Sequence, residues 1–165
     1  MILSILLLFN SALPGQDNYK QQAGKAMQSG KWAKAVELFE VHLKAHEEDA
    51  SAWYLKGYCL VQNKKYETAI PVLKKASTLG YSSPAAVRFN LAKCHTQLGD
   101  YEKGMDILET AVNNGFSAYN RLKDPEFEPL QQQKRMAVLI AKAEKNAYPC
   151  LSDENWRRFD FWIGK

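Results

Sequence analysis

Two histidines have a spacing that suits a metal site. His42 and His46 are four residues apart, so on a helix they share one face, and imidazole nitrogen is a common zinc ligand. The acidic run Glu47 to Asp49 follows them, but no third ligand converges on the pair, since His95 stands far along the chain. A basic helix end followed by an acidic helix start explains the same residues through the helix dipole. We therefore expect no metal centre and no cofactor.

The chain carries none of the short motifs that mark common catalytic sites. It has no G-x-S-x-G, no glycine-rich phosphate loop and no Cys-x-x-Cys, and its acidic residues are dispersed. We therefore expect no intrinsic catalysis. The net charge is +4, but the lysines are spread through the chain without a basic run. This distribution argues against a nucleic-acid partner.

The same residue types recur every 34 to 35 residues. In each of three segments an aromatic residue is followed three residues later by a small one, and four residues after that by a large apolar one. These residues are Trp32, Ala35 and Phe39, then Tyr66, Ala69 and Leu73, then Tyr101, Gly104 and Leu108. Such a period predicts stacked helical hairpins, which bury a continuous core only when at least three are present.

Small residues should lie where the two helices of each hairpin cross closely. The expected contact points are Ala23 with Ala35, Gly57 with Ala69, and Ala92 with Gly104. The pattern predicts helices over 18–29, 32–45, from 49, 66–79, from 83 and 101–114. Prolines at 125 and 129 then rule out one long helix. A turn and a helix over about 130–146 should follow, with an apolar stripe (Leu130, Met136, Leu139, Ile140, Ala143) that covers the end of the stack.

The second and third units carry the motif of a known family. Trp53-Tyr54-x-x-Gly57-x-x-Leu60 followed by Tyr66-x-x-Ala69 resembles the tetratricopeptide repeat. The resemblance covers about residues 17 to 117. It implies an all-α fold, a TPR-like α-solenoid of three antiparallel helix pairs over 16–117. An irregular turn and a capping helical element over 118–147 would complete the stack.

In tetratricopeptide stacks the first helix of each pair lines a binding groove. The residues that this resemblance places in the groove are Lys20, Tyr54, Tyr58, Gln62, Phe89, Lys93 and Gln97. Rings suit apolar anchors, amides suit a peptide backbone and lysines suit carboxylates, so the implied partner is a protein or peptide. A plain solvated groove, or one that the chain's own tail fills, is the alternative.

Cys59 and Cys94 occupy equivalent places in neighbouring units. Stacked helices lie about 8–10 Å apart, whereas a disulfide needs Cα atoms within about 7 Å. We therefore expect no bridge between them, and interpret both as small buried apolar residues. Cys150 lies outside the repeats. An odd count of three in an exported chain leaves at least one thiol free or paired with another molecule.

Residues 1–15 differ from the rest of the chain. Ile2 to Phe9 is almost purely apolar, and no charge precedes Asp17. The stretch is too short to span a bilayer, which takes about 20 residues. It predicts a secretory signal peptide, and so an exported, periplasmic or extracellular protein without an integral membrane span in the mature chain. A buried N-terminal helix is the alternative.

The last 18 residues, 148–165, have the composition of a linker and an aromatic tail. The phrase Phe-Asp-Phe-Trp-Ile-Gly at 159–164 resembles the opening strand of small exported β-barrel domains that follow such repeats in some bacterial proteins. The sequence thus leaves two hypotheses for function. The first is an exported repeat scaffold that binds protein or peptide. The second is an accessory repeat region of a longer protein whose β-barrel domain binds a small ligand or is catalytic.

Overall fold

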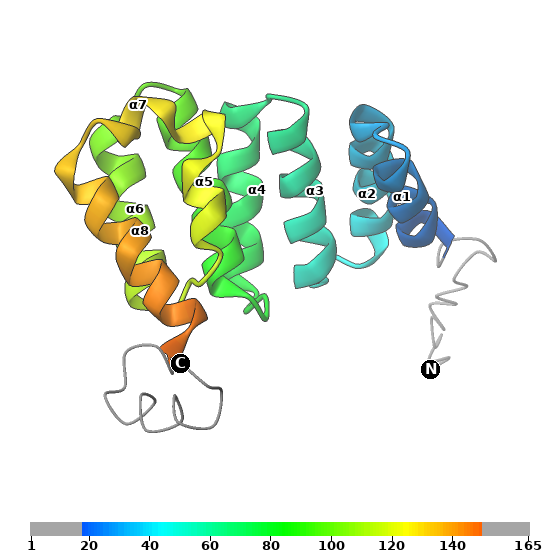
Figure 1. Ribbon diagram of the computed structural model, residues 1–165. Coiled ribbons are helices and arrows are strands. Elements are labelled where there is room, and N and C mark those ends of the chain that lie inside the picture. Colours follow the sequence, from blue (N-terminus) through cyan, green and yellow to red (C-terminus); the bar gives the residue numbers. More distant parts are fainter. Residues whose placement is uncertain (1–17, 150–165) are drawn as a thin grey trace, which may run out of the picture.

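The computed structural model describes residues 18–149, and these form a row of antiparallel helix pairs (Figure 1). The first pair is α1 (Asn18–Gln28) and α2 (Trp32–Ala45), the second is α3 (Ala50–Gln62) and α4 (Tyr66–Thr78), and the third is α5 (Pro84–Gln97) and α6 (Tyr101–Asn113). Within these residues there is no strand. The expected all-α stack of three helix pairs is confirmed.

The turn inside each pair requires one residue with a positive φ. Gly30 and Gly99 fill this position in the first and third pairs, with φ of 67° and 84°, and Lys64 fills it in the second, with φ of 56°. Because a Cβ disfavours this region, glycine is the ordinary choice there. The second pair therefore carries a local backbone strain that the other two pairs avoid.

The junctions after α4 and α6 also match each other. Gly80 and Gly115 end the helices with φ of 73° and 89°. The next amides, those of Tyr81 and Phe116, donate back to carbonyls five residues upstream at 3.0 Å. Both aromatic side chains then fold against rings on the first helices of the second and third pairs, so each junction is fixed by a ring contact as well as by hydrogen bonds.

Two helix crossings leave no room for a side chain. A Cβ built on Gly104 would lie 2.6 Å from Thr96 Oγ1 and 3.3 Å from the carbonyl oxygen of Ala92. A Cβ on Gly57 would lie 2.6 Å from Cδ2 of Leu73, so at this crossing the nearest neighbour is Leu73 rather than the expected Ala69. The need for small residues at these two positions is confirmed.

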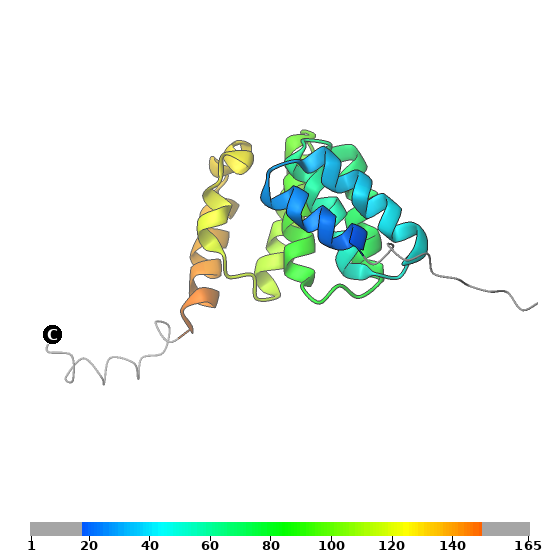
Figure 2. The same ribbon diagram turned by 90° about the vertical axis from the view of Figure 1, so that its right-hand side faces the viewer.

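The chain after α6 folds back over the third pair. It forms η1 (Tyr119–Lys123), η2 (Pro125–Phe127), α7 (Glu128–Gln131) and α8 (Lys134–Ala147). The single helix expected over 130–146 is therefore divided, because α7 ends at Gln131 and α8 begins three residues later. We call residues 119–131 the covering segment and α8 the cap helix. Figures 1 and 2 show both lying against one side of the third pair.

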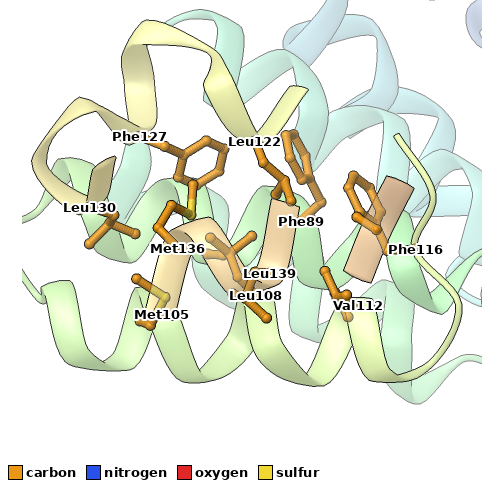
Figure 3. Packing of buried hydrophobic residues seen from close by; sticks show 13 residues of the cluster. Phe89, Met105, Leu108, Val112, Phe116, Leu122, Phe127, Leu130, Met136 and Leu139 are labelled. Carbon is orange, nitrogen blue, oxygen red and sulfur yellow. The ribbon is translucent and has the colours of Figure 1, made fainter. Parts of the chain in front are cut away.

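The covering segment and cap helix complete a hydrophobic core with α5 and α6 (Figure 3). Leu122, Phe127 and Leu130 of the covering segment are fully buried in it. The predicted apolar stripe also packs there, with Ile140 partly buried and its other members buried. The end of the stack is therefore closed by the chain itself, as expected for a solenoid.

Arg135 ties the start of the cap helix to α6. Its guanidinium donates from Nε to Glu109 at 2.7 Å, from one terminal nitrogen to Asp106 at 2.6 Å and from the other to Glu102 at 3.0 Å. Hydrogen bonds to the first two carboxylates raise the pKa of Arg135. The three acids lie on one exposed face of α6, so this network contributes little stability and mainly fixes the position of the cap helix along α6.

Two of the expectations concern residues outside the described range. The signal peptide at 1–15 lies before it, and all but the first two residues of the tail at 148–165 lie beyond it.

Within the described range, Cys59 and Cys94 are both buried free thiols, so the expectation of no bridge is confirmed. Burial raises the pKa of each thiol to about 12, which leaves neither reactive as a thiolate.

Candidate peptide-binding face

The groove residues expected from the sequence lie on α1, α3 and α5, whose surfaces form what we call the inner face. They include two equivalent sets, each 35 residues from the other. The second-unit set is Tyr54, Tyr58 and Gln62, and the third-unit set is Phe89, Lys93 and Gln97. Their positions on the helices correspond, but the structure surrounds them differently.

Phe89 of the third-unit set is a core residue. Its ring is 1% exposed, stacks on Phe116 with centroids 5.1 Å apart and meets Phe127 edge-on at 5.3 Å. The guanidinium of Arg121 lies 4.3 Å from the ring centroid. The expectation that Phe89 lines an open groove is therefore wrong, because the covering segment seals it (Figure 3).

Lys93 and Gln97 are also engaged by the covering segment. Lys93 is 7% exposed and its ammonium pairs with the carboxylate of Glu126. This hydrogen bond lowers the pKa of Glu126. Gln97 Nε2 donates to the carbonyl oxygen of the same residue at 2.8 Å. Because a lysine is buried only when it is paired, Lys93 is not open to another molecule in this conformation. Gln97 remains exposed, although its amide is already hydrogen-bonded to the covering segment.

The second-unit set is only half-buried. Tyr54 stacks on Tyr81 with centroids 4.2 Å apart, and its hydroxyl accepts a hydrogen bond of 3.3 Å from Asn90. Burial raises the pKa of Tyr54, so its hydroxyl stays protonated. Tyr58 meets Trp32 edge-on, with centroids 6.0 Å apart. Both rings are therefore held in place before any partner arrives.

Lys20, the expected groove residue of the first unit, has a structural partner. Its ammonium donates to Asp49 Oδ2 at 2.7 Å, and His42 Nε2 lies 3.0 Å from the same oxygen. Asp49 also caps α3, as its other oxygen accepts from Ala52 N at 2.9 Å. Burial raises the pKa of Asp49, but these hydrogen bonds outweigh it and bring the value to about 2. Lys20 thus links the first pair to the second.

The two histidines that suited a metal site stack on each other. The rings of His42 and His46 have centroids 4.4 Å apart, and His42 is directed to Asp49. Across residues 18–149 no group of three or more His, Cys, Asp or Glu side chains is placed to hold a metal ion.

Some residues of this face escaped sequence reasoning. Glu126 and Phe127 form the cover, and Tyr81 and Arg121 flank Tyr54. The match between the two glycine-aromatic junctions was a signal for Tyr81. The two prolines within the covering segment predicted a break in the helix, but nothing in the repeat pattern showed where the segment would pack.

Comparison with known proteins gives a family match and repeat-protein neighbours. The family model described as "Anaphase-promoting complex, cyclosome, subunit 3" matches residues 28–111. A chloroplast protein of Arabidopsis thaliana is 28% identical over 96 residues, which are 55% of this chain. The chain spans 28% of the length of that relative.

Two solved structures share the fold. The crystal structure of MamA superposes with a TM-score of 0.67 at 15% identity, over 84% of this chain and 81% of that one. The type III secretion translocator chaperone SycD of Yersinia enterocolitica has a TM-score of 0.56 at 19% identity, over 78% of this chain and 91% of that one. Both are helical repeat stacks, and at these identities the likeness concerns the fold alone. Of the helices that the structure describes, none is long and apolar enough to cross a membrane.

Proposed function

Because the chain belongs to the family described as "Anaphase-promoting complex, cyclosome, subunit 3", a family of tetratricopeptide-like repeats, we propose that it is a scaffold that binds a protein or peptide and has no catalysis of its own. The binding site is the uncovered part of the inner face, the second-unit set. Rigid tyrosines supply contact area at a small cost in conformational entropy, which suits them to a protein interface.

The observation that carries this proposal is the way the chain covers its own third unit. There a ring of the covering segment meets Phe89, a carboxylate meets Lys93 and a main-chain carbonyl meets Gln97. A polypeptide thus fits this helix face through side chain and backbone together. The second-unit set offers the same three positions, with rings at two of them and an amide at the third, and all three side chains keep part of their surface exposed.

The proposal is tested by quantitative affinity capture with the full chain as bait. We expect a partner that the wild type retains and that Tyr58→Ala/Gln62→Ala loses, with at least tenfold weaker binding. The matched control is Thr68→Ala/Ser77→Ala, which alters two exposed polar residues on α4 and should retain the partner. Circular dichroism should show equal helicity for all three proteins. A partner retained equally by both variants would refute this site.

We also propose that the protein works outside the cytoplasm, because residues 1–15 have the composition of a secretory signal. A fusion of the first 20 residues to a phosphatase that is active only after export tests this in a bacterial host. Activity should depend on the apolar run, and Leu6→Arg/Leu7→Arg should abolish it. Phosphatase activity that survives this change, or never arises, would contradict export.

A further inference from the structure

A second candidate site lies between α2, α3 and α4. It is an open cleft of about 370 Å³, with Leu43 and Trp53 among its apolar lining residues. Tyr54, Tyr58 and Gln62 do not line this cleft, so a ligand here need not contact the second-unit set. The volume accommodates one large side chain and its neighbours.

The aromatic ring in this cleft is fixed in place. The indole of Trp53 donates from Nε1 to the carbonyl oxygen of Glu47 at 2.7 Å. The ammonium of Lys56 lies 5.5 Å from its ring centroid and 3.0 Å from a carboxylate oxygen of Glu40. A ring held on two sides loses little freedom when a partner packs on it, which favours binding.

The charges around the ring favour an acidic partner. Lys44, Lys56 and Lys75 line the cleft together with two carboxylates, those of Glu40 and Glu47. The Lys56 and Glu40 charges neutralise each other. Two ammonium groups then face one carboxylate. Neither Lys44 nor Lys75 has a hydrogen-bond or ion-pair partner for its ammonium among residues 18–149. Charge complementarity therefore selects a negatively charged occupant.

We propose that this cleft is a second docking site, which takes an acidic peptide segment of a partner that carries a large apolar side chain. The apolar side chain packs against Trp53 and Leu43, and the acidic groups reach Lys44 and Lys75. Tyr54, Tyr58 and Gln62 are not among the lining residues, so binding in this cleft is independent of the second-unit set.

The test is an NMR titration of the ¹⁵N-labelled full chain that monitors the indole N–H signal of Trp53. The variant Trp53→Phe, which lacks this signal, identifies it in the spectrum. The probe is acetyl-Asp-Leu-Glu-Phe-amide, and the matched neutral probe is acetyl-Asn-Leu-Gln-Phe-amide. We expect a saturable shift of the Trp53 signal with the acidic probe and at least fivefold weaker binding of the neutral one. Lys44→Ala/Lys75→Ala should weaken binding of the acidic probe by a similar factor.

The control variant Lys34→Ala/Lys74→Ala also removes one lysine charge from α2 and one from α4, but at positions that do not line the cleft. It should bind the acidic probe as the wild type does. Equal loss in both double variants would mean attraction by net charge alone and would overturn the proposal. An absent Trp53 shift, or equal affinity for the two probes, would also overturn it. Tyr58→Ala/Gln62→Ala should leave this titration unchanged, so failure here is distinct from failure of the inner-face site.

Discussion

The second and third units present equivalent positions on the inner face, and the chain uses them in opposite ways. In the third unit the chain's own residues 119–131 bury Phe89 and Lys93 and hydrogen-bond Gln97. In the second unit Tyr54, Tyr58 and Gln62 keep part of their surface exposed. The repeat therefore supplies a common surface, and the segment C-terminal to the repeat decides which part of that surface remains available.

This contrast extends to the packing beneath the surface. The largest hydrophobic cluster of the described residues joins the third pair, the covering segment and the cap helix, whereas the first pair shares a smaller cluster with α3. The third unit, whose ring and lysine are buried, contributes mainly to stability. The second unit, whose rings are fixed in position but half-exposed, is suited to binding. We expect substitutions in the two regions to differ accordingly.

Phe127→Ala should produce the largest effect. Its fully buried ring contacts Phe89 in the core, so its removal should lower the free energy of unfolding by about 3–5 kcal/mol. Tyr58→Ala removes a half-buried ring that meets Trp32 edge-on, and should cost less, about 1–2 kcal/mol. Urea denaturation followed by circular dichroism measures both. Equal costs would show that the second-unit set is as structural as the cover.

Glycine substitutions give the next largest contrast. Gly104→Ala would drive a methyl group into Thr96 and the backbone of α5, and should cost about 1–3 kcal/mol. Gly24→Ala, in α1, meets no atom within 4 Å and should stabilise the protein by up to about 1 kcal/mol, because alanine favours the helix. Thermal denaturation should move in opposite directions. A destabilised Gly24→Ala would show that the first pair is packed more tightly than its open space indicates.

The acid sensitivity of the two regions should follow their carboxylates. Asp49 has a pKa of about 2 when folded and near 3.8 as a free side chain. A carboxylate whose pKa is lowered by folding stabilises the fold at pH values above its pKa in the unfolded chain. That contribution disappears as the pH falls toward its pKa in the folded state, here between about pH 5 and 2. The shift corresponds to about 2 kcal/mol, since one pKa unit is about 1.4 kcal/mol.

Asp49→Asn should therefore lose stability at neutral pH and lose less than the wild type on acidification. Glu126→Gln should act in the same direction at the third unit, because its pKa is lowered too, but more weakly, since Glu126 is the more exposed of the two side chains. Urea midpoints at pH 7, 4 and 3 measure both slopes. A variant whose acid dependence matches the wild type would show that its carboxylate does not stabilise the folded state.

The architecture could be predicted because its signals repeat. Trp32, Tyr66 and Tyr101 recur at a regular spacing. Small residues such as Gly104 recur where two helices cross too closely for a large side chain, and residue size can be read from the sequence. Capping by Asp49 is likewise local, since its carboxylate reaches an amide only three residues away. Features that depend on short separations or on a period were therefore predictable.

The cover of the third unit was not predictable in the same way. Glu126 meets Lys93 across 33 residues of sequence, and the contact occurs once, so no period reveals it. Phe89 has the same place in its unit as Tyr54, but Phe116 and residues 119–131 make it a core residue, whereas Tyr54 stays half-buried. The candidate site was therefore predicted as a face, and its division into covered and open parts required the tertiary structure.

The smallest predicted effect concerns the backbone of the open region. Lys64 holds a φ of 56°, where its Cβ is unfavourable, whereas the equivalent turn of the third unit uses Gly99. Lys64→Gly should raise the free energy of unfolding by up to about 1 kcal/mol, because relief of this strain exceeds the added entropy of the unfolded chain. Lys65→Gly removes the same charge at φ −93° and should be neutral or destabilising. If the urea midpoint rises for Lys65→Gly instead, the loss of charge, and not the strain, distinguishes the second turn from the third.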